Sequence, residues 1–271
     1  MDSFIKNELE QKARIIRQKT IEYSKEGYTY HFGGSFSATE ILTYLYFRVL
    51  DSDSIGHKNR DKILLSKGHA CVPMYVIFSM LGCIDEAELN TYKGIKSRLQ
   101  AHPDMNKLTY IDFSSGSLGQ GLSIGVGMAI ANKLKKNDHK IHVILGDGEC
   151  DEGQVWEAAM AASKYKLDNM ICFLDYNKLQ VDGSVEEIMP MVNVVEKWKS
   201  FGWYVLEVDG HDFVDIDSAY EKCKTVENMP KIIIANTVKG KGVSFMENKV
   251  EWHSMRLDKE LKQQALIELK E

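Results

Sequence analysis

Residues 141–160 read IHVILGDGECDEGQVWEAAM, and residues 170–179 read MICFLDYNKL. Each stretch opens with five apolar residues that predict a buried strand, and residues 154–165 between them predict a helix. Short apolar runs separated by helices are typical of parallel strands joined by right-handed crossovers. The pattern continues with strands expected at 204–208 and 231–238 and helices at 118–134, 192–201 and 214–226. The sequence therefore predicts an α/β fold: a doubly wound, mainly parallel sheet with helices on both faces.

The composition is that of an ordinary globular protein. Of 271 residues, 44% are hydrophobic, and the net charge of -5 gives no general attraction to nucleic acid or to an anionic membrane. No repeat or low-complexity linker divides the chain, so we expect one domain over 1–271. The longest uncharged stretch, 70–84, is shorter than the roughly 20 residues that span a membrane. With scattered cysteines and no apolar secretory signal at the start, we expect a cytoplasmic protein with reduced thiols.

Both ends of the chain predict amphipathic helices. The first helix is expected to stop at Gly27, because glycine is favoured just after a helix C-terminus. The last lies near the end of the chain, where apolar residues alternate with charges. The apolar positions are Ile5, Leu9, Ala13, Ile16 and Ile21 in the first helix, and Leu257, Leu261, Ala265, Leu266 and Leu269 in the last.

Polar residues follow two of the expected strands at the point where each strand ends. Gly146, Asp147 and Gly148 come directly after 141–145, and Asn177 follows 170–174. Ligands of such sheets bind outside the carboxyl ends of the strands, and a helix that begins there favours a phosphate group. Carboxylate and amide oxygens suit Mg²⁺ or Ca²⁺ shared with a diphosphate. The alternative is a plain strand-to-helix turn with Asp147 as a helix N-cap, and the presence of Asn177 disfavours it.

Two competing phosphate motifs can be checked directly. The chain has no Gly-Lys-Ser/Thr sequence, so it carries no P-loop; residues 240–242 read Gly-Lys-Gly. Gly125 and Gly127 lack the third small residue of a dinucleotide fingerprint and lie inside an expected helix. We interpret them as helix-packing residues.

The Gly146-Asp147-Gly148 turn followed by Asn177 resembles the diphosphate-binding signature of thiamine diphosphate enzymes. Further blocks narrow the resemblance to transketolase, and they occur in that family's order between about residues 10 and 255. The chain resembles the N-terminal, diphosphate-binding subunit of a transketolase that is split over two chains. The blocks are HFGGS (31–35), LSKGHA (65–70), His102-Pro103, GSLGQG (116–121) and GECDEGQVWEA (148–158).

The resemblance implies a set of site residues. Asp147, Asn177 and the main-chain carbonyl of Leu179 would hold Mg²⁺, for which Ca²⁺ or Mn²⁺ could substitute. Gly116 to Leu118 would form a wall beside the cofactor's aminopyrimidine, and Glu152 would lie at a subunit contact. The residues expected to bind thiamine diphosphate are Gly116, Ser117, Leu118, Gly146, Gly148, Glu152, Asn177, Lys239 and His253. An alternative for Lys239 is a solvated surface lysine.

Four of the eight histidines match active-site histidines of the family: His31, His69, His102 and His253. The resemblance implies that they line the sugar channel, where neutral imidazoles exchange hydrogen bonds with hydroxyl groups and assist proton transfer. The other four, His57, His139, His142 and His211, match no block, and we expect them to be surface or structural residues.

The implied reaction is the transfer of a two-carbon ketol unit from a ketose, phosphorylated or not, to an aldose. The later domains of a full-length transketolase are missing, so a second subunit should supply them, by analogy in an α2β2 assembly. Three alternatives remain: the α subunit of a 2-oxoacid dehydrogenase E1, a deoxyxylulose-phosphate synthase, and a non-catalytic subunit that binds the cofactor and regulates a partner.

Overall fold

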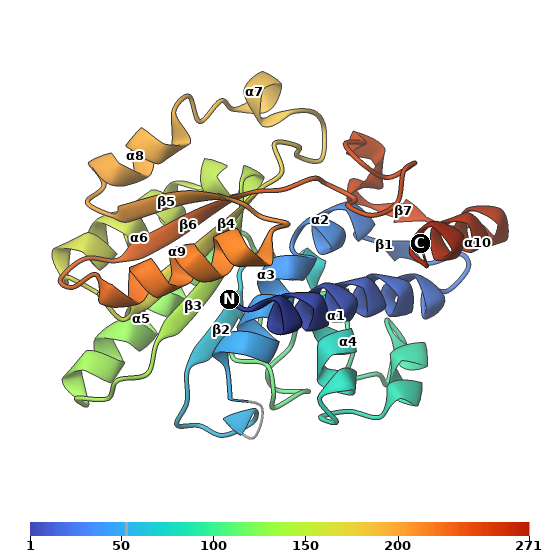
Figure 1. Cartoon of the computed structure of the whole chain (residues 1–271), viewed down its shortest axis with the longest axis horizontal. Coiled ribbons are helices and arrows are strands. Elements are labelled where there is room, and N and C mark those ends of the chain that lie inside the picture. Colours follow the sequence, from blue (N-terminus) through green and yellow to red (C-terminus); the bar gives the residue numbers. More distant parts are fainter. Residues whose placement is uncertain (52–53, 271) are drawn as a thin grey trace.

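The computed structural model describes residues 1–51 and 54–270, so residues 52, 53 and 271 of the expected domain lie outside the described part. A five-stranded sheet forms its centre, with strand order β2-β3-β4-β6-β5 and every neighbouring pair parallel (Figure 1). The strands are β2 (Lys62–Leu65), β3 (Ile141–Gly146), β4 (Met170–Tyr176), β5 (Tyr204–Asp209) and β6 (Lys231–Asn236).

Four of these strands confirm the expected ones. The strand expected at 231–238 ends at Asn236, two residues early. Strand β2 was not predicted, because its four residues, KILL, are too few to distinguish a strand from other short apolar runs. A small antiparallel pair, β1 (Thr29–Tyr30) with β7 (Met255–Arg256), joins the two ends of the chain beside the sheet.

Helices cover both faces of the sheet, as expected (Figure 1). Along β3 and β4 alternate side chains enter opposite layers: Val143 and Cys172 pack with one set of helices, and Ile144 and Phe173 with the other. The first set is α5 (Gln120–Leu134), α6 (Gly153–Lys164) and α8 (Val194–Ser200). The second is α1 (Ser3–Glu22), α3 (Thr39–Tyr44), α4 (Val72–Met80) and α9 (Phe213–Thr225).

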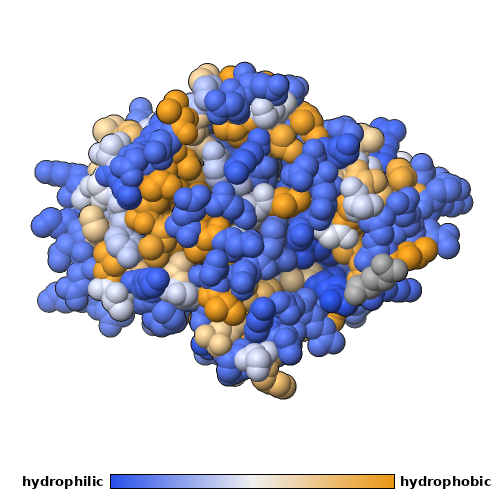
Figure 2. All heavy atoms as spheres, turned by 45° about the horizontal axis from the view of Figure 1, so that its top comes forward, coloured by the Kyte–Doolittle hydropathy of each residue, from blue (hydrophilic) through white to orange (hydrophobic). Residues whose placement is uncertain are grey.

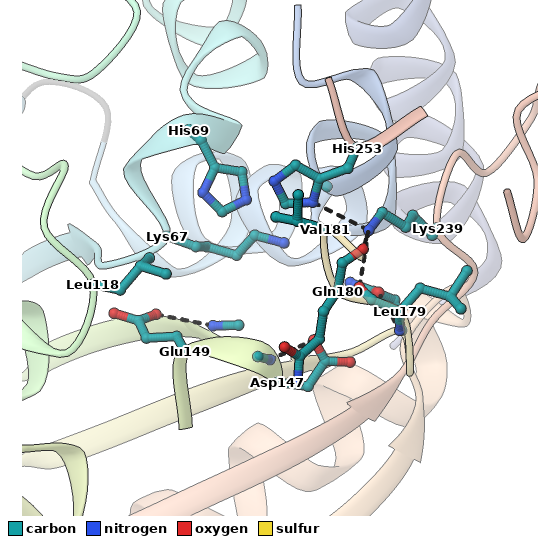
Figure 3. A pocket seen from close by; sticks show the side chains of 14 residues that line it. Lys67, His69, Leu118, Asp147, Glu149, Leu179, Gln180, Val181, Lys239 and His253 are labelled. Carbon is teal, nitrogen blue, oxygen red and sulfur yellow. Dashed lines mark hydrogen bonds between the residues drawn. The ribbon is translucent and has the colours of Figure 1, made fainter. Parts of the chain in front are cut away.

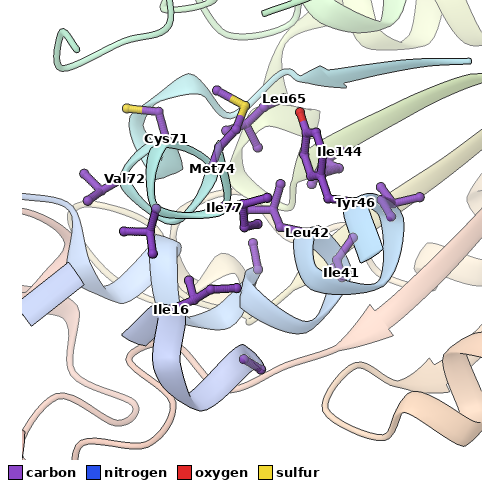
Figure 4. Close-up of a cluster of buried hydrophobic side chains, with 14 of the residues drawn as sticks. Ile16, Ile41, Leu42, Tyr46, Leu65, Cys71, Val72, Met74, Ile77 and Ile144 are labelled. Carbon is purple, nitrogen blue, oxygen red and sulfur yellow. The ribbon is translucent and has the colours of Figure 1, made fainter. Parts of the chain in front are cut away.

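The second layer fixes the segments that carry site residues. Figure 4 shows Ile16 of α1, Leu42 of α3 and Ile77 of α4 directed toward a shared core with Leu65 and Ile144 of the sheet. Each of these side chains is at most 3% exposed. This packing holds the short helix α2 (Phe32–Ser37) and the start of α4 against the carboxyl ends of β2 and β3, because both are joined directly to the packed elements.

The terminal helices differ from expectation in one detail. Helix α10 (Lys259–Glu268) lies where the last amphipathic helix was expected. The first helix ends at Glu22 with Tyr23 as its cap, so the prediction that it stops at Gly27 was wrong. Gly27 has φ of 81° and serves the turn between α1 and β1, which the sequence pattern does not distinguish from a helix C-terminus.

All five cysteines lie in the described part of the chain, and none of them forms a disulfide. Among the helices in residues 1–51 and 54–270, none combines the length and the apolar character that crossing a membrane requires.

Helix α5 distinguishes the two glycines that we interpreted as packing residues. A Cβ added to Gly125 would lie 2.8 Å from Cγ2 of Val143 on β3, so the helix can approach the sheet only with glycine there. A Cβ added to Gly127 would meet nothing within 4 Å. The packing interpretation therefore holds for Gly125 and is wrong for Gly127, which lies on the exposed side.

These two glycines give a matched pair of substitutions. Gly125→Ala should lower the free energy of unfolding by about 1–3 kcal/mol, because the new methyl group overpacks against Val143. Gly127→Ala should raise it by about 0.5–1 kcal/mol, because alanine loses less backbone entropy in a helix. Urea unfolding followed by circular dichroism measures both changes. Equal effects of the two substitutions would contradict this packing.

Candidate functional site

A pocket opens at the carboxyl edge of the sheet, where the site was expected (Figure 3). Segments that follow β2, β3, β4 and β6 line it. Nine of the expected site residues are among those that line it: His69, Leu118, Gly146, Asp147, Gly148, Asn177, Leu179, Lys239 and His253. The other five expected residues, His31, His102, Gly116, Ser117 and Glu152, do not line this pocket.

Asp147 is a buried carboxylate at the end of β3. It is 3% exposed; Oδ1 accepts a hydrogen bond from the amide of Gly148 at 2.8 Å, and Oδ2 from the amide of Lys178 at 2.5 Å. Burial, with the nearby Asp175 carboxylate, raises the pKa of Asp147 to about 7. Two amides do not balance a full negative charge in this setting, and a bound cation would.

The turn after β4 directs two more oxygen atoms toward the same pocket. Lys178 has φ of 66°, an uncommon conformation for a residue with a side chain, and it reverses the chain between Asn177 and Leu179. Oδ1 of Asn177 accepts from the amide of Leu179 at 3.1 Å, and its amide nitrogen donates to Asp175 at 3.4 Å. Strands β3 and β4 are hydrogen-bonded neighbours, as predicted, so these oxygens and Asp147 share one sheet edge.

This donor set fits a hard divalent cation that is only partly coordinated by protein. The available oxygens are a carboxylate, a side-chain amide and a main-chain carbonyl, which are the ligand types of Mg²⁺ and Ca²⁺. In the described residues, no group of three or more His, Cys, Asp or Glu side chains is arranged to hold a metal. A cation here would therefore need further oxygens from a ligand such as a diphosphate.

Lys239 is a buried lysine whose ammonium group lies in the pocket. The side chain is 1% exposed, so the alternative of a solvated surface lysine was wrong. Nζ donates to the carbonyls of Leu179 at 2.9 Å and Gln180 at 2.8 Å and lies 3.2 Å from Nδ1 of His253 (Figure 3). Burial and the neighbouring Lys67 lower the pKa of Lys239 to about 8. The ammonium group binds only neutral oxygens there, so an anion would be a favourable partner.

A second buried lysine was missed by the sequence analysis. Lys67 follows β2, is 2% exposed and forms an ion pair with Asp175 of β4. Asp175 also accepts hydrogen bonds from the hydroxyls of Ser37, at 2.6 Å, and Thr237. Lys67 holds the pKa of Asp175 below its usual value although burial alone would raise it. The available signal was a charged residue at or just after the end of an apolar run, in KILLSK and MICFLD.

The four predicted histidines form one cluster. The ring centroid of His31 lies 5.3 Å from that of His69, 5.6 Å from that of His253 and 6.4 Å from that of His102. Burial, with positive neighbours, lowers the pKa of His31 to about 4 and that of His253 to about 3, and lowers the pKa of His69 and His102. All four rings are therefore neutral at pH 7. Buried Nδ1 of His31 has no hydrogen-bond partner in the described part of the chain, which suits a ligand hydroxyl.

The glycine-rich segment before α5 lies between the histidine cluster and the pocket. A Cβ added to Gly116 would touch the ring of His102 at 3.6 Å, and Leu118 lines the pocket. Gly116 and Ser117 are exposed, as is Glu152 at the start of α6. The expected contact of Glu152 with a partner chain stays a prediction.

The remaining histidines lie where we expected surface or structural residues. His142 is buried and contacts the hydroxyl of Tyr220 at 3.0 Å, and His57 is exposed. His139 lies near Asp61 at 3.6 Å. His211 accepts from the amide of Val238 at 2.8 Å and contacts Glu40, which supports the segment that carries Lys239.

The fold and the pocket together are typical of enzymes that bind a phosphorylated cofactor at the carboxyl edge of a parallel sheet. Residues 5–268 match the family model described as "Transketolase, thiamine diphosphate binding domain". The chain belongs to the transketolase family, and over nearly its whole length it corresponds to this domain. The predicted family, and with it the enzyme class, is confirmed.

Relatives of two lengths are similar to this chain. A 6-deoxy-6-sulfo-D-fructose transketolase subunit from Clostridium sp. (strain MSTE9) is 42% identical over 97% of this chain and 96% of its own. An apulose-4-phosphate transketolase subunit from Actinobacillus succinogenes is 40% identical over 98% and 97%. Human transketolase is 35% identical, and the match covers 96% of this chain but 42% of the human one. The crystal structure of transketolase from Campylobacter jejuni superposes with a TM-score of 0.87 at 28% identity, covering all of this chain and 43% of that one.

The neutral histidines predict a pH dependence of stability. An unfolded histidine takes up a proton near its ordinary pKa of 6.5, whereas folded His31 and His253 stay neutral down to about pH 4 and 3. The unfolded state therefore binds more protons in this window, and the free energy of unfolding should fall as the pH falls from 6.5 toward 4. Urea unfolding between these pH values should show a smaller fall in a His31→Asn/His253→Asn variant than in the wild type. The exposed His57→Asn control should keep the wild-type slope. An unchanged slope in the double variant would show that these rings are not held neutral.

Proposed function

We propose that this chain is the diphosphate-binding subunit of a two-chain transketolase that moves a two-carbon ketol unit from a ketose to an aldose. The observation that carries the proposal is that the four-histidine cluster and the pocket with two buried lysines and an oxygen donor set meet at one sheet edge. The transketolase family match disfavours the 2-oxoacid dehydrogenase alternative. We also propose that the chain is one cofactor-binding domain and that it is cytoplasmic.

In this proposal, Asp147, Asn177 and the carbonyl of Leu179 hold Mg²⁺, and Gly146 and Gly148 let the backbone approach the diphosphate. Lys239 exchanges its two carbonyl partners for diphosphate oxygens, and Lys67 adds a second positive charge beside the metal. The negative charge of the diphosphate supports this assignment, because a metal and two cations balance it. When bound, thiamine diphosphate supplies the electron sink that lets a carbon–carbon bond next to a carbonyl break.

The histidines act on the sugar in this proposal. The hydroxyl beside the cleaved bond must lose a proton and later regain it, and neutral imidazoles in contact can accept and return it. His69 and His253, with ring centroids 5.1 Å apart, reach the pocket, and His31 and His102 extend the cluster away from it. The unpartnered Nδ1 of His31 supports a role in holding a hydroxyl group. Burial of the cluster helps to exclude water.

The lengths of the relatives support a partner chain. Subunits named for sulfofructose and apulose phosphate match this chain end to end, whereas human transketolase is more than twice as long as the part that matches. We infer that a second subunit carries the remaining domains, in an α2β2 assembly. The named substrates of both short relatives carry an anionic group, which supports a sugar phosphate or a similarly charged sugar as the substrate here.

Replacing the expected metal ligand tests the cofactor site. In the complex with the second subunit, Asp147→Ala should weaken Mg²⁺-dependent thiamine diphosphate binding by roughly 100-fold or more, because the charged ligand is lost. Calorimetric titration with and without Mg²⁺ measures the change. The matched control is Asp215→Ala, which removes an exposed aspartate from α9 and should leave the affinity unchanged. Wild-type affinity in Asp147→Ala would refute the ligand assignment.

A transfer assay tests the reaction itself. The complex with a second subunit should transfer two carbons from a ketose donor to an aldose acceptor, detected as a new ketose by mass spectrometry. The purified single chain should give no detectable product, because the later domains are absent from it. Turnover by the single chain would contradict the two-chain proposal. Tight cofactor binding without transfer on any sugar pair would instead support a non-catalytic, regulatory subunit.

A further inference from the structure

Glu149 is a buried carboxylate that none of the roles above uses. It lies two residues after Asp147, in the 3₁₀ turn Gly148–Asp151 between β3 and α6, and is 2% exposed. It has no ion-pair partner among the described residues, although Lys67 lies close enough to influence it. Figure 3 shows its carboxylate beside Leu118, on the side of the pocket where the glycine-rich segment enters.

Three hydrogen bonds tie this carboxylate to three separate segments. Oε1 accepts from the amide of Gly119 at 2.9 Å and from the hydroxyl of Ser66, and Oε2 accepts from the amide of Gly146 at 3.0 Å. Ser66 directly follows β2, Gly146 ends β3, and Gly119 caps the N-terminus of α5. One side chain thus joins the glycine turn of the pocket to the segment that leads into α5.

The approach of Gly119 to this corner is specific. Gly119 has φ of 80°, and an added Cβ would lie 2.8 Å from Cβ of Glu152. Its amide, which α5 itself cannot satisfy because it lies at the helix start, points to Oε1 of Glu149. The position of Gly116 to Leu118 relative to Asp147 and Gly148 therefore depends on this contact.

We propose that Glu149 is a positioning residue that sets the distance between the glycine turn at 146–148 and the wall at 116–118. This inference rests on the proposed function only in assigning the two ends of one cofactor to these two segments. A carboxylate is required because three donors converge on it from different directions. A glutamine of the same size offers one acceptor oxygen, and its NH₂ group would face a donor.

Amide hydrogen exchange tests the positioning without any ligand. In Glu149→Gln, peptides covering 116–121 should exchange roughly 10-fold faster or more, because the amide of Gly119 loses its acceptor, while peptides from β4 and β6 keep their wild-type rates. The control Glu260→Gln replaces an exposed glutamate of α10 and should change neither region. Unchanged exchange at 116–121 would overturn the proposal, as would equal acceleration throughout the sheet.

Ligand binding separates positioning from general damage to the pocket. Glu149→Gln should weaken thiamine diphosphate binding to the complex by about 10-fold, while binding of inorganic diphosphate with Mg²⁺, which reaches only the glycine turn, should change less than twofold. Equal losses for both probes would overturn the positioning role. If the wild-type complex binds neither probe, the proposed function fails, and the exchange experiment still decides whether Glu149 holds the wall.

A milder variant covers the case in which Glu149→Gln does not fold. Ser66→Ala removes one of the three donors and leaves both backbone contacts of Glu149 in place. It should accelerate exchange at 116–121 by a smaller factor than Glu149→Gln, with β4 and β6 unchanged. No acceleration at 116–121 in a folded Ser66→Ala protein would count against the proposed carboxylate junction.

Discussion

The ion pair between Lys67 and Asp175 is the interaction on which the rest of the site depends. Lys67 follows β2 and Asp175 lies on β4, so the pair reaches across the end of β3, which lies between them. Gly146 occupies that end, and a Cβ there would come 3.7 Å from Cβ of Lys67. Removing one partner of a buried ion pair typically costs about 3–5 kcal/mol, because the other charge is left uncompensated. The pair therefore holds three strand ends, and with them Asp147 and Asn177, in one arrangement.

Local patterns in the sequence predicted what depends on local patterns. Apolar runs marked four strands, and the residues after them marked Asp147 and Asn177, because the strand-end rule needs only the position of each run. Strand β2 was too short for that signal, and Gly27 was misplaced because glycine serves loops and helix ends alike. Lys67, Asp175 and Glu149 were missed for a different reason. Their importance comes from partners that are distant in sequence: residues 67 and 175 are 108 positions apart, and 119 and 149 are 30.

The two halves of the functional argument rest on different kinds of observation. The pocket can be argued from physical chemistry: buried oxygens without a cation, buried lysines without an anion, and glycines where a side chain would block approach. The histidine cluster shows that four rings converge and are neutral, but its link to sugar chemistry comes from the family. Apolar side chains interrupt the polar surface of the face that carries α7 (Val185–Ile188) and α8 (Figure 2), among them Val181, Ile188, Met189 and Val192. Val181 also lines the pocket, so this apolar surface reaches the site.

The hydrogen bonds of Lys239 have a consequence for how the pocket is filled. The ammonium group rests on the carbonyl of Leu179, one of the oxygens assigned to the metal. Filling the site is therefore an exchange reaction, in which an internal contact must break before a new one forms, and its free energy is the difference between the two. We expect this to make the empty pocket self-sufficient: the chain can fold and persist before any ligand arrives, and ligand affinity is lower by the strength of the contact that is given up.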